Sequence, residues 1–376
     1  MKKHLYNTNN TKKIPVGILG ATGTVGQKFI YLLSRHPWFK ISCVAASSRS
    51  AQKSYSEAVQ GRWVENISIP KLLKNLTVYN INTDIDTISE KVNLLFSAVS
   101  MDKTAVRKLE EKYAEKGIPV VSCNSAHRWT EDVPMIIPEV NPHHLDIIEI
   151  QQKNRHWEQG FISVKPNCSI QSYVPVLHAL QAFQIEKVLV STYQAVSGAG
   201  KTLKAWPEMD DNVIPYISGE EEKSEQEPMK IWGTIKNNKI IKSKTPVISS
   251  TCIRVPVSDG HLVSVSVKFK KNPGYKEIVD AIDSFDNPLE NLKLPSSPEK
   301  FLYYFENDSR PQTKLDRNLD NGMAVSIGRL RKDPVLDWKF VALSHNTIRG
   351  AAGGAVLIAE LLYKKNYLSS KVLHEN

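Results

Sequence analysis

The sequence predicts an α/β protein in which a doubly wound, parallel-sheet domain is followed by an α+β domain with a mixed or antiparallel sheet. The first observation is a buried strand, a glycine-rich turn and a helix in immediate succession near the amino end. The second is an alternation of strand-like and helix-like segments up to about residue 165, which is typical of βαβ units. The third is a change after residue 165 to segments that alternate apolar and polar residues, as half-buried antiparallel strands do.

The glycine-rich turn defines the first domain. Residues 16–19 form a short apolar strand, residues 20–26 read Gly-Ala-Thr-Gly-Thr-Val-Gly, and apolar residues recur at helical spacing through residue 33. In this order, backbone N–H groups at the helix start can approach a pyrophosphate. The spacing G-x-x-G-x-x-G differs from the commoner G-x-G-x-x-G, and a tight turn in an unrelated α/β protein is the alternative. We predict a Rossmann-type domain that holds a dinucleotide at Gly20, Thr22, Gly23, Thr24 and Val25.

The end of the second strand indicates which dinucleotide binds. Residues 41–46 are strand-like and run into Ser47, Ser48, Arg49 and Ser50. A domain specific for NAD usually has Asp or Glu near this place, to accept hydrogen bonds from the ribose hydroxyls. Hydroxyls and a guanidinium instead suit a 2′-phosphate, so their joint position favours NADP. Each of these residues taken singly is also compatible with a solvated loop.

Two further segments continue the parallel sheet. Residues 92–96 form a strand that leads into a charged amphipathic helix ending near residue 116, and Gly117 closes that helix. Residues 118–121 then start another strand. This βαβ order predicts parallel pairing.

Cys168 is the strongest candidate for a reactive side chain. Val164 is typical of a strand end, Pro166 disfavours a helical continuation, and an apolar-periodic segment follows Cys168. Because Pro175 would break a helix that began at residue 169, we expect the helix to begin near Ser172 with Cys168 just before it. A helix start favours thiolate over thiol, and a cysteine thioester can be reduced by hydride. A lone cysteine is, however, more often buried and structural.

The second half of the chain has a different pattern. Residues 187–193 and 261–267 alternate as half-buried antiparallel strands do, and residues 349–360 predict a helix of small apolar residues that packs back on the cofactor domain. We therefore expect residues 1–165, completed by a carboxyl-terminal helix over 349–376, to form the NADP-binding domain. Residues 166–348 are expected to form the catalytic and dimerisation domain. Residues 287–310 are expected to be a long surface excursion, and the tail through Asn10 a disordered lead-in.

Composition excludes several classes of protein. With 376 residues and 41% hydrophobic content the chain can bury a sizeable core, and it has neither a run long enough to span a bilayer nor a signal-peptide core. The net charge of +10 comes from lysines spread along the chain, so we expect no nucleic-acid partner. Metal-ligand spacing is absent among its cysteines, which predicts no metal, reduced thiols and a cytoplasmic location. These cysteines are Cys43, Cys123, Cys168 and Cys252.

Taken together, the motifs resemble those of the aspartate-β-semialdehyde dehydrogenase family, in particular its archaeal and fungal branch. The resemblance covers nearly the whole chain from Ile14 to about Leu362. One departure is His127, at a position where the family more often has an aromatic or other apolar residue. The motifs that carry the resemblance are residues 20–26, 47–50, 124–128, 138–141, 166–169, 194–200, 220–223, 252–261, 321–323 and 344–350.

The resemblance implies roles for the residues around the cysteine. Cys168 corresponds to the nucleophile that forms an acyl-thioester, and His261 to the acid/base at the thiohemiacetal. Arg254 corresponds to the guanidinium that grips the substrate's α-carboxylate, Gln194 to an amide that orients the substrate, and Glu220 to the acceptor for its amino group. Arg254 and His261 are seven residues apart, so on one strand they would face opposite sides; Pro256 and Asp259-Gly260 predict a bend that brings both to one pocket.

The remaining assignments follow the same resemblance. Lys223 and Arg128 correspond to the pair that holds the transferable phosphate, and Asn167 to a further substrate-binding residue. Asn346 resembles a residue beside the nicotinamide carboxamide. The other cofactor-binding residues that the resemblance implies are Ser97, Ser197 and Gly198.

The implied reaction is the NADPH-dependent reduction of 4-phospho-L-aspartate to L-aspartate 4-semialdehyde, on the route to lysine, diaminopimelate, threonine and methionine. The implied assembly is a homodimer or a dimer of dimers. Aspartyl phosphate carries a carboxylate, an ammonium and a phosphate, and the chain offers Arg254, Glu220 and a Lys/Arg pair to match them. Two alternatives stay open: a malonyl-CoA reductase-like enzyme on the same scaffold, and a non-catalytic NADP-binding protein. Arg254 could hold malonate's free carboxylate as well, whereas retention of the thiol and imidazole argues against a non-catalytic protein.

Overall fold

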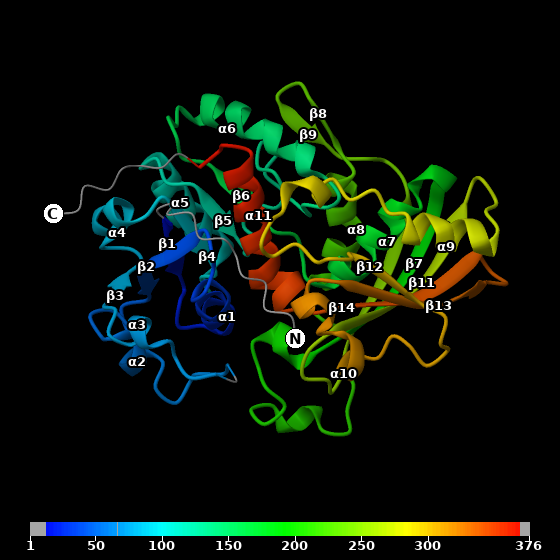
Figure 1. The fold of residues 1–376 in the computed structure, drawn as a ribbon, viewed down its shortest axis with the longest axis horizontal. Helices are drawn as coiled ribbons and strands as arrows, with labels where there is room; N and C mark the ends of the chain where they lie inside the picture. Colours follow the sequence, from blue (N-terminus) through cyan, green and yellow to red (C-terminus); the bar gives the residue numbers. More distant parts are fainter. Residues whose placement is uncertain (1–12, 66, 369–376) are drawn as a thin grey trace.

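The computed structural model describes residues 13–65 and 67–368 (Figure 1). The predicted lead-in through Asn10 and the part of the predicted carboxyl-terminal helix beyond residue 368 lie outside the described residues. The first sheet has six parallel strands in the order β3-β2-β1-β4-β5-β6, which confirms the predicted doubly wound fold. Its strands are β1 Ile14–Leu19, β2 Phe39–Ala46, β3 Val78–Asn80, β4 Leu94–Ser97, β5 Val120–Ser122 and β6 Ile162–Val164.

Helices connect these strands in the βαβ order that the sequence predicts. The helix that precedes Gly117 is α5 (Lys103–Glu115), and Asp102 caps its start. The Asp102 carboxylate accepts hydrogen bonds from the N–H groups of Thr104 and Ala105 at 3.0 Å each. The helices of this half are α1 Thr24–Leu33, α2 Tyr55–Ala58, α3 Lys71–Lys74, α4 Ile85–Lys91, α5 Lys103–Glu115 and α6 Ile148–Arg155, with a 3₁₀ segment at Pro142–Ile147.

The second sheet is mixed, with six strands in the order β10-β7-β11-β14-β13-β12. Most pairs are antiparallel, and the two parallel pairs are β10 with β7 and β12 with β13. The strands are β7 Ile185–Gln194, β10 Val247–Arg254, β11 His261–Phe269, β12 Leu302–Phe305, β13 Val325–Lys332 and β14 Trp338–Ser344. A separate hairpin pairs β8 Thr234–Lys236 with β9 Lys239–Ile241. The helices are α7 Val174–Ala179, α8 Glu220–Ile231, α9 Tyr275–Asp283 and α10 Thr313–Asp316.

The expectation of a loose excursion over residues 287–310 is wrong in part. Leu302–Phe305 form the edge strand β12, and Leu289 and Leu294 are buried against the first domain's core. The prolines and serines of this stretch hid a short strand, because four residues are too few to show a period of two convincingly.

The carboxyl-terminal helix begins later than predicted. A π-helical turn at Ile348–Ala352 precedes α11, Gly353–Lys364, which contacts α1 and β5 and lies between the two sheets (red in Figure 1). Its small residues allow this close packing, and it has buried positions on all sides except near its end.

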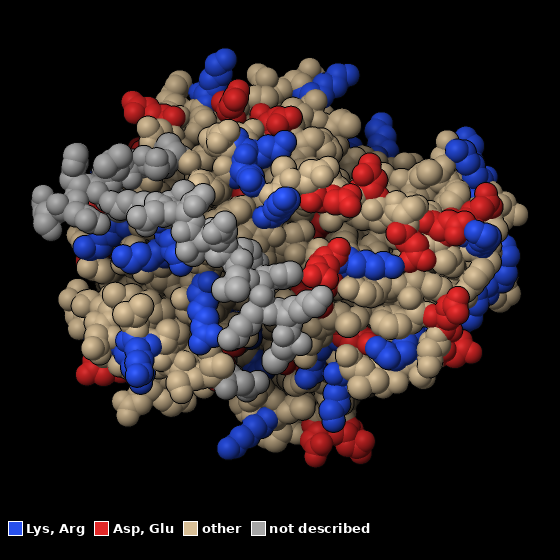
Figure 2. All heavy atoms as spheres, in the orientation of Figure 1, with Lys and Arg blue, Asp and Glu red and all other residues tan. Residues whose placement is uncertain are grey.

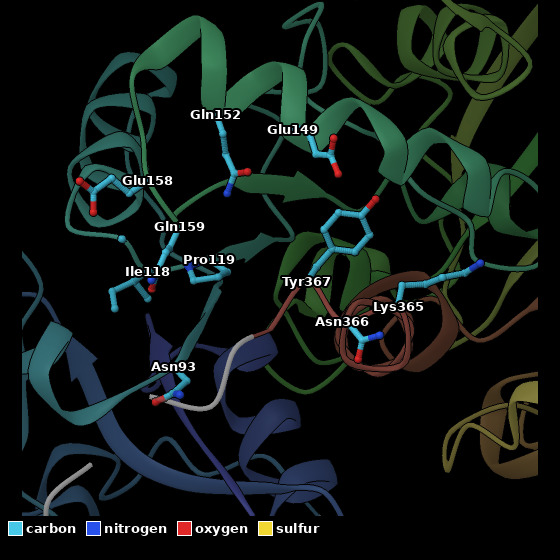
Figure 3. Close-up of a pocket in the computed structure, with 11 residues that line it drawn as sticks. Asn93, Ile118, Pro119, Glu149, Gln152, Glu158, Gln159, Lys365, Asn366 and Tyr367 are labelled. Atoms are coloured by element: carbon cyan, nitrogen blue, oxygen red, sulfur yellow. The ribbon is translucent and has the colours of Figure 1, made fainter. Parts of the chain in front are cut away.

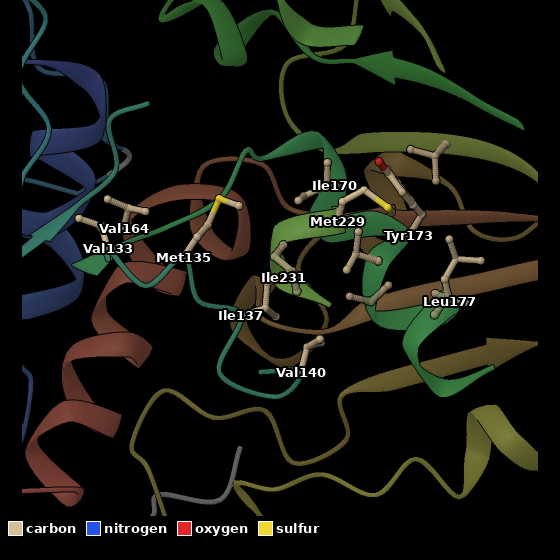
Figure 4. Close-up of a cluster of buried hydrophobic side chains, with 14 of the residues drawn as sticks. Val133, Met135, Ile137, Val140, Val164, Ile170, Tyr173, Leu177, Met229 and Ile231 are labelled. Atoms are coloured by element: carbon tan, nitrogen blue, oxygen red, sulfur yellow. The ribbon is translucent and has the colours of Figure 1, made fainter. Parts of the chain in front are cut away.

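The two halves share one continuous hydrophobic core. Figure 4 shows apolar side chains of residues 133–140, which connect β5 to β6, and of Val164 at the end of β6. They pack with Ile170, Tyr173 and Leu177 in and before α7 and with Met229 and Ile231 of α8. All of these side chains are at most 8% exposed. Because apolar contact runs across the junction, the position of the cysteine corner relative to both sheets is set by packing.

Charges on the surface are mixed in sign. On the face shown in Figure 2, basic and acidic side chains are interspersed, and the net charge does not gather there into one basic stripe. Among the described residues, no helix is both long enough and apolar enough to cross a bilayer.

Candidate active site

The glycine-rich turn follows β1, the strand from which the sheet extends in both directions. β2 and β3 lie on one side of β1, and β4, β5 and β6 lie on the other. Gly20 has a φ of +79°, and a Cβ there would lie 2.4 Å from the carbonyl oxygen of Ala98. Gly23 caps α1 without any side chain over the helix start. The first turn of α1 therefore presents its N–H groups to an open crevice at the carboxyl end of the sheet, which fits a dinucleotide pyrophosphate.

The ribose end of this crevice carries more positive charge than the sequence indicated. Ser47, Ser48 and Arg49 are exposed after β2, whereas Ser50 is buried. Arg62, which the sequence analysis did not identify, donates from Nη2 to the Ser50 hydroxyl at 3.5 Å. Its place twelve residues downstream in a loop left no local signal. One guanidinium, Arg49, thus stands within the serine run and a second, Arg62, lies beside Ser50, and both types of group suit a 2′-phosphate.

Cys168 lies at the predicted corner after β6, and the helix begins two residues after its predicted start near Ser172. A 3₁₀ turn at Ser169–Ser172 follows Cys168 directly, and α7 begins only at Val174, with Pro175 in its first turn. The side chain of Asn167 closes the turn, because its Oδ1 accepts from both the N–H and the hydroxyl of Ser169. A single 3₁₀ turn carries little dipole, so the argument that a helix start favours the thiolate does not hold here.

His261 faces the cysteine. Its Nε2 lies 3.4 Å from Cys168 Sγ, and the backbone N–H of Ala195 donates to its Nδ1 at 3.1 Å. Since Nδ1 accepts, the neutral ring carries its hydrogen on Nε2, directed at the sulfur. Burial, with the charge of Arg254, lowers the pKa of His261 to about 3. Burial, with the Glu220 carboxylate, raises the pKa of the Cys168 thiol to about 11.

Three predicted residues lie close together at the same end of three neighbouring strands of the second sheet. Gln194 and Arg254 are the last residues of the parallel strands β7 and β10 and are paired in register, while His261 is the first residue of the antiparallel β11 on the other side of β7. The connection over residues 255–260 crosses from β10 to β11, which confirms the predicted bend. Arg254 donates from Nη1 to the carbonyl of Ala195 at 2.7 Å.

Glu220 joins several of the predicted substrate residues. It begins α8, and its carboxylate accepts from Lys223 Nζ at 2.7 Å, from Asn167 Nδ2 at 3.0 and 3.1 Å, and from Gln194 Nε2 at 3.3 Å. It is 9% exposed. A carboxylate that is largely buried and already faces donors is suited to accept an ammonium group in the same place.

Arg128 is held by the protein at each of its three nitrogens. Nε donates to the Lys165 carbonyl, Nη2 to the Cys123 carbonyl, and Nη1 to Glu227 at 2.8 Å. A guanidinium has five N–H groups, so two remain for a ligand. Glu227 also accepts the Asn167 N–H at 2.6 Å. The sequence analysis missed Glu227, although its place seven residues after Glu220 puts both on one face of α8.

Asn346 is predicted beside the nicotinamide, and Ser97, Ser197 and Gly198 are further predicted cofactor-binding residues. Asn346 bridges the site, since its Nδ2 donates to the Ser197 hydroxyl at 2.9 Å and its Oδ1 accepts the Gly260 N–H at 2.8 Å. Gly198 lies so close to Arg254 and His261 that a Cβ there would be 2.9 Å from Arg254 Nη1. Ser97 is fully buried and its hydroxyl accepts from Asn124, and its role in cofactor binding stays a prediction.

A cavity of about 280 Å³ collects most of these groups. It opens between the glycine turn and the cysteine corner, and His261, Gln194 and Arg254 are buried behind its lining. Thiol, imidazole, carboxylate, ammonium and guanidinium groups thus surround one small volume, which suits covalent acyl chemistry on an anionic substrate. Its lining comprises Val25, Cys123, Asn124, Ser125, Arg128, Asn167, Cys168, Ser197, Gly198, Glu220, Lys223, Asn346, Thr347, Gly350 and Ala351.

A second hollow, of about 340 Å³, lies at the amino ends of the strands of the first sheet, opposite the end that carries the glycine turn (Figure 3). Its walls come from segments that precede β4, β5 and β6, together with α6 and the residues after α11. Glu149, Glu158 and Lys365 on its rim are exposed, and its lining contains neither a thiol nor an imidazole. The smaller cavity at Cys168 is therefore the candidate active site. Across the described ranges, no three His, Cys, Asp or Glu side chains gather in a way that could hold a metal ion.

Two family models match the chain. Residues 15–148 match the model described as "Semialdehyde dehydrogenase, NAD binding domain", and residues 176–349 match "Semialdehyde dehydrogenase, dimerisation domain". The glycine turn falls in the first match, and His261, Arg254 and Glu220 fall in the second. Cys168 lies in the short segment between them.

Relatives match over almost the full length. An aspartate-semialdehyde dehydrogenase of Archaeoglobus fulgidus is 43% identical over 94% of this chain and 99% of its own, and that of Saccharomyces cerevisiae is 40% identical over 95% and 99%. A malonyl-CoA reductase (NADP) of Metallosphaera sedula is 35% identical over 96% and 99%. The crystal structure of the Candida albicans aspartate-semialdehyde dehydrogenase with NADP superimposes with a TM-score of 0.84 at 35% identity, over 95% of this chain and 100% of that one.

Proposed function

The chain belongs to the aspartate-semialdehyde dehydrogenase family, and on that premise we propose that it reduces 4-phospho-L-aspartate to L-aspartate 4-semialdehyde with NADPH. The observation that carries this proposal is the pairing of Cys168 Sγ with His261 Nε2 at 3.4 Å, beside a cavity that also presents Glu220 and Lys223. A thiol next to an imidazole and a dinucleotide crevice supports acyl reduction rather than alcohol oxidation.

The substrate is held by its charges. Arg254 binds the α-carboxylate, Glu220 binds the α-ammonium, and Lys223 with the two remaining N–H groups of Arg128 binds the phosphate. Cys168 sulfur forms a bond to the acyl carbon while the bond from that carbon to the phosphate oxygen breaks. When bound in the crevice, NADPH supplies the hydride that reduces the resulting thioester. His261 donates a hydrogen bond from Nε2 to the oxygen on the reacting carbon. The bond from that carbon to the sulfur then breaks, which releases the aldehyde and frees Cys168.

We place this reaction in the biosynthesis of lysine, diaminopimelate, threonine and methionine. The biosynthetic role of the family supports this placement. We also propose a cytoplasmic location. The four cysteines support it, since all of them are unpaired in the structure.

The proposed substrate is tested in the reverse direction. Reduction of NADP is measured with aspartate semialdehyde plus phosphate, and separately with malonate semialdehyde plus coenzyme A. We expect turnover in the first assay only, because Glu220 has no ammonium to bind in malonate semialdehyde. Turnover only in the second assay would make the chain a malonyl-CoA reductase, and turnover in neither would contradict acyl reduction.

We propose that two copies pair through the outer face of the second sheet. The match to a dimerisation domain supports this, and so does the composition of that face, where aliphatic side chains alternate with small hydroxyl residues. Leu189 is 48% exposed and Val247 is 64% exposed. The residues on this face are Leu189, Ser191, Tyr193, Val247, Ser249, Thr251, Ile253, Leu262, Ser264 and Ser266.

Sedimentation measures this pairing. Leu189→Asp is expected to shift the protein to a monomer, because a carboxylate in an apolar interface lacks a partner. Leu72→Asp, on the exposed helix α3, is the control and should leave the assembly unchanged. A dimer that persists in Leu189→Asp would place the interface elsewhere.

A further inference from the structure

Lys165 is a buried lysine without a carboxylate partner, three residues before Cys168. Only 2% of it is exposed, and its Nζ donates to the carbonyl of Pro166 at 2.9 Å. Within the described part of the chain, no Asp or Glu forms an ion pair with it. A buried ammonium in such a place is costly, because one carbonyl replaces little of its hydration.

The groups around Lys165 favour its uncharged amine. Its side chain passes over the start of α11, where a Cβ on Gly354 would lie 2.9 Å from Lys165 Cε, and a helix start repels a cation. The guanidiniums of Arg128 and Arg349 act in the same direction. Burial is the largest cause, and together these effects lower the pKa of Lys165 to about 7. An amine with this pKa can accept a proton near neutral pH.

Lys165 and Cys168 pack against the same short segment. A Cβ on Gly350 would lie 2.8 Å from Cys168 Cβ, and the glycine that contacts Lys165 follows four residues later. These contacts place both side chains along residues 350–354, where the π-helical turn passes into α11, and each group contributes to the electrostatic field at the other.

His261 is poorly placed to receive the proton of the Cys168 thiol. Its Nε2 already carries the hydrogen of the neutral ring, because Nδ1 accepts the Ala195 N–H. A second proton would have to enter at Nδ1 and break that bond, next to the charge of Arg254. His261 can thus donate to the sulfur or to the substrate oxygen, but another group has to take the proton when Cys168 becomes a nucleophile.

We propose that Lys165 is the proton acceptor of Cys168, so that thiol and amine convert to a thiolate–ammonium pair before attack on the acyl phosphate. The proton leaves Sγ and binds Nζ, and no net charge enters or leaves the buried site. Sγ and Nζ form no direct hydrogen bond in the described structure, so the proposed transfer requires a bridging group such as water or a small shift of the flexible lysine side chain. After the aldehyde has left, the ammonium returns the proton to the sulfur.

The other charged groups around the pair are consistent with this role. Around the sulfur, Arg128 and Arg254 stabilise the thiolate and Glu220 opposes it, while the thiolate of Cys168 stabilises the ammonium of Lys165. An internal transfer that creates a close pair of opposite charges costs less in a buried site than release of the proton, which would leave a lone anion. The role rests on the proposed use of Cys168 as the nucleophile.

Alkylation of Cys168 by iodoacetamide tests the proposal without substrate. The rate for the Cys168 peptide is followed by mass spectrometry from about pH 5 to about pH 10, a range that spans ordinary thiol titration. We expect Lys165→Met to react at least about tenfold more slowly near pH 7, which corresponds to a rise of about one unit in the apparent pKa of the thiol. Lys165→Arg carries a permanent cation that can stabilise the thiolate but cannot accept its proton, so its rate is expected to lie between those of Lys165→Met and the unsubstituted protein.

Lys230→Met is the matched control. Lys230 is also 2% exposed with its pKa lowered to about 7 by burial, but the carbonyls of Arg128, Thr130 and Val133 surround its ammonium. Its loss should lower the unfolding temperature and leave the pH profile of Cys168 alkylation unchanged. An unchanged pH profile in Lys165→Met would overturn the proposal, and so would a folded Lys165→Arg whose rate and pH profile match those of the unsubstituted protein.

A second measurement covers the case in which Lys165→Arg does not fold. The ultraviolet absorbance of the thiolate is titrated as a difference from Cys168→Ser, in otherwise unsubstituted protein and in Lys165→Met. We expect the thiolate signal to appear at higher pH in Lys165→Met, and coincident titrations would contradict the role. Neither measurement uses turnover, so a failure of the proposed reductase activity would leave these results standing and would be recognised separately.

Discussion

Cys168 and His261, which are 93 residues apart in the chain, meet with Sγ and Nε2 separated by 3.4 Å at the junction of the two sheets. The cysteine comes from the corner after β6 of the first sheet, and the histidine is the first residue of β11 of the second. The reactive pair therefore exists only when both sheets are packed together. Substitutions on either side test different parts of the proposed chemistry.

Cys168→Ser is expected to abolish turnover and leave NADP binding nearly unchanged, because a serine hydroxyl is much less acidic than a thiol and a far weaker nucleophile near neutral pH. Cofactor binding is measured by fluorescence titration and turnover by NADPH oxidation. Cys43→Ala, in the buried part of β2, is the control and should keep activity within about tenfold, or about 1.4 kcal/mol in the barrier. Substantial activity in Cys168→Ser would contradict a covalent mechanism.

Arg49→Ala is expected to weaken NADP selectively, by about 1.5–3 kcal/mol, because a charge-assisted contact to the 2′-phosphate is lost. Arg62→Ala should act in the same direction, since Arg62 also flanks Ser50. NAD has no 2′-phosphate, so its affinity should hardly change. Binding of both cofactors is measured for each variant, with the exposed Arg35→Ala, beyond the far end of α1, as the control. Equal losses for both cofactors would mean that Arg49 is structural or contacts the pyrophosphate.

Arg254→Lys is expected to raise KM for aspartate semialdehyde strongly. A lysine cannot reproduce a two-pronged contact to the carboxylate while it also bonds the Ala195 carbonyl. A fall in kcat would follow if the reacting carbon moves away from Cys168. Steady-state kinetics measure both constants, with the surface variant Arg329→Lys as the control. An unchanged KM would remove Arg254 as the carboxylate anchor and weaken the assignment of an amino-acid substrate.

His261→Asn is expected to lower kcat by about 10²–10⁴, the usual contribution of general acid–base catalysis. Asparagine retains some hydrogen bonding but cannot exchange a proton near neutral pH. Since KM should change little, the ratio of the two effects separates His261 from Arg254. A variant in which only KM changes would show that His261 binds substrate rather than assisting the chemistry.

Acid is expected to destabilise the fold through its buried histidines. Burial lowers the pKa of His144 to about 4, from an ordinary value of 6.5, and His127, His261 and His345 are lowered for the same main reason. As pH falls below 6.5, the unfolded chain takes up protons that the folded protein does not bind until about pH 4. The free energy of unfolding therefore decreases with falling pH over this window.

Adjacent histidines offer a matched test of this pH dependence. His144 is buried and its Nε2 lies 3.0 Å from the Gly233 carbonyl, whereas His143 is exposed. His144→Gln should reduce the loss of unfolding free energy between about pH 7 and about pH 5 by about 1 kcal/mol or more, and His143→Gln should leave it unchanged. Urea unfolding at several pH values measures both. Identical slopes for the two variants would mean that His144 is protonated in the folded state.

Local patterns predicted most of the elements that build the site. The apolar strand and glycine turn at residues 16–26 predicted β1, the turn and α1, and the alternation over residues 187–193 and 261–267 predicted β7 and β11. These segments are recognisable because each side chain's burial follows directly from its own strand or helix period. The 3₁₀ turn after Cys168 and the strand β12 were not predicted, because a single 3₁₀ turn and a four-residue edge strand show no clear period.

By itself, the sequence determined the fold class and the dinucleotide-binding turn, since these depend on residue types and short-range spacing, and it predicted Cys168 and His261 as the reactive residues. Tertiary structure alone decided their partners. Register between β7 and β10 aligned Gln194 with Arg254, and packing of α8 brought Glu227 to Arg128 and Asn167. It likewise left Lys165 without a carboxylate and turned the Nε2 hydrogen of His261 toward Cys168. The physical reason is that hydrogen-bond partners and burial, and through them pKa values, depend on segments many residues apart, which no local spacing records.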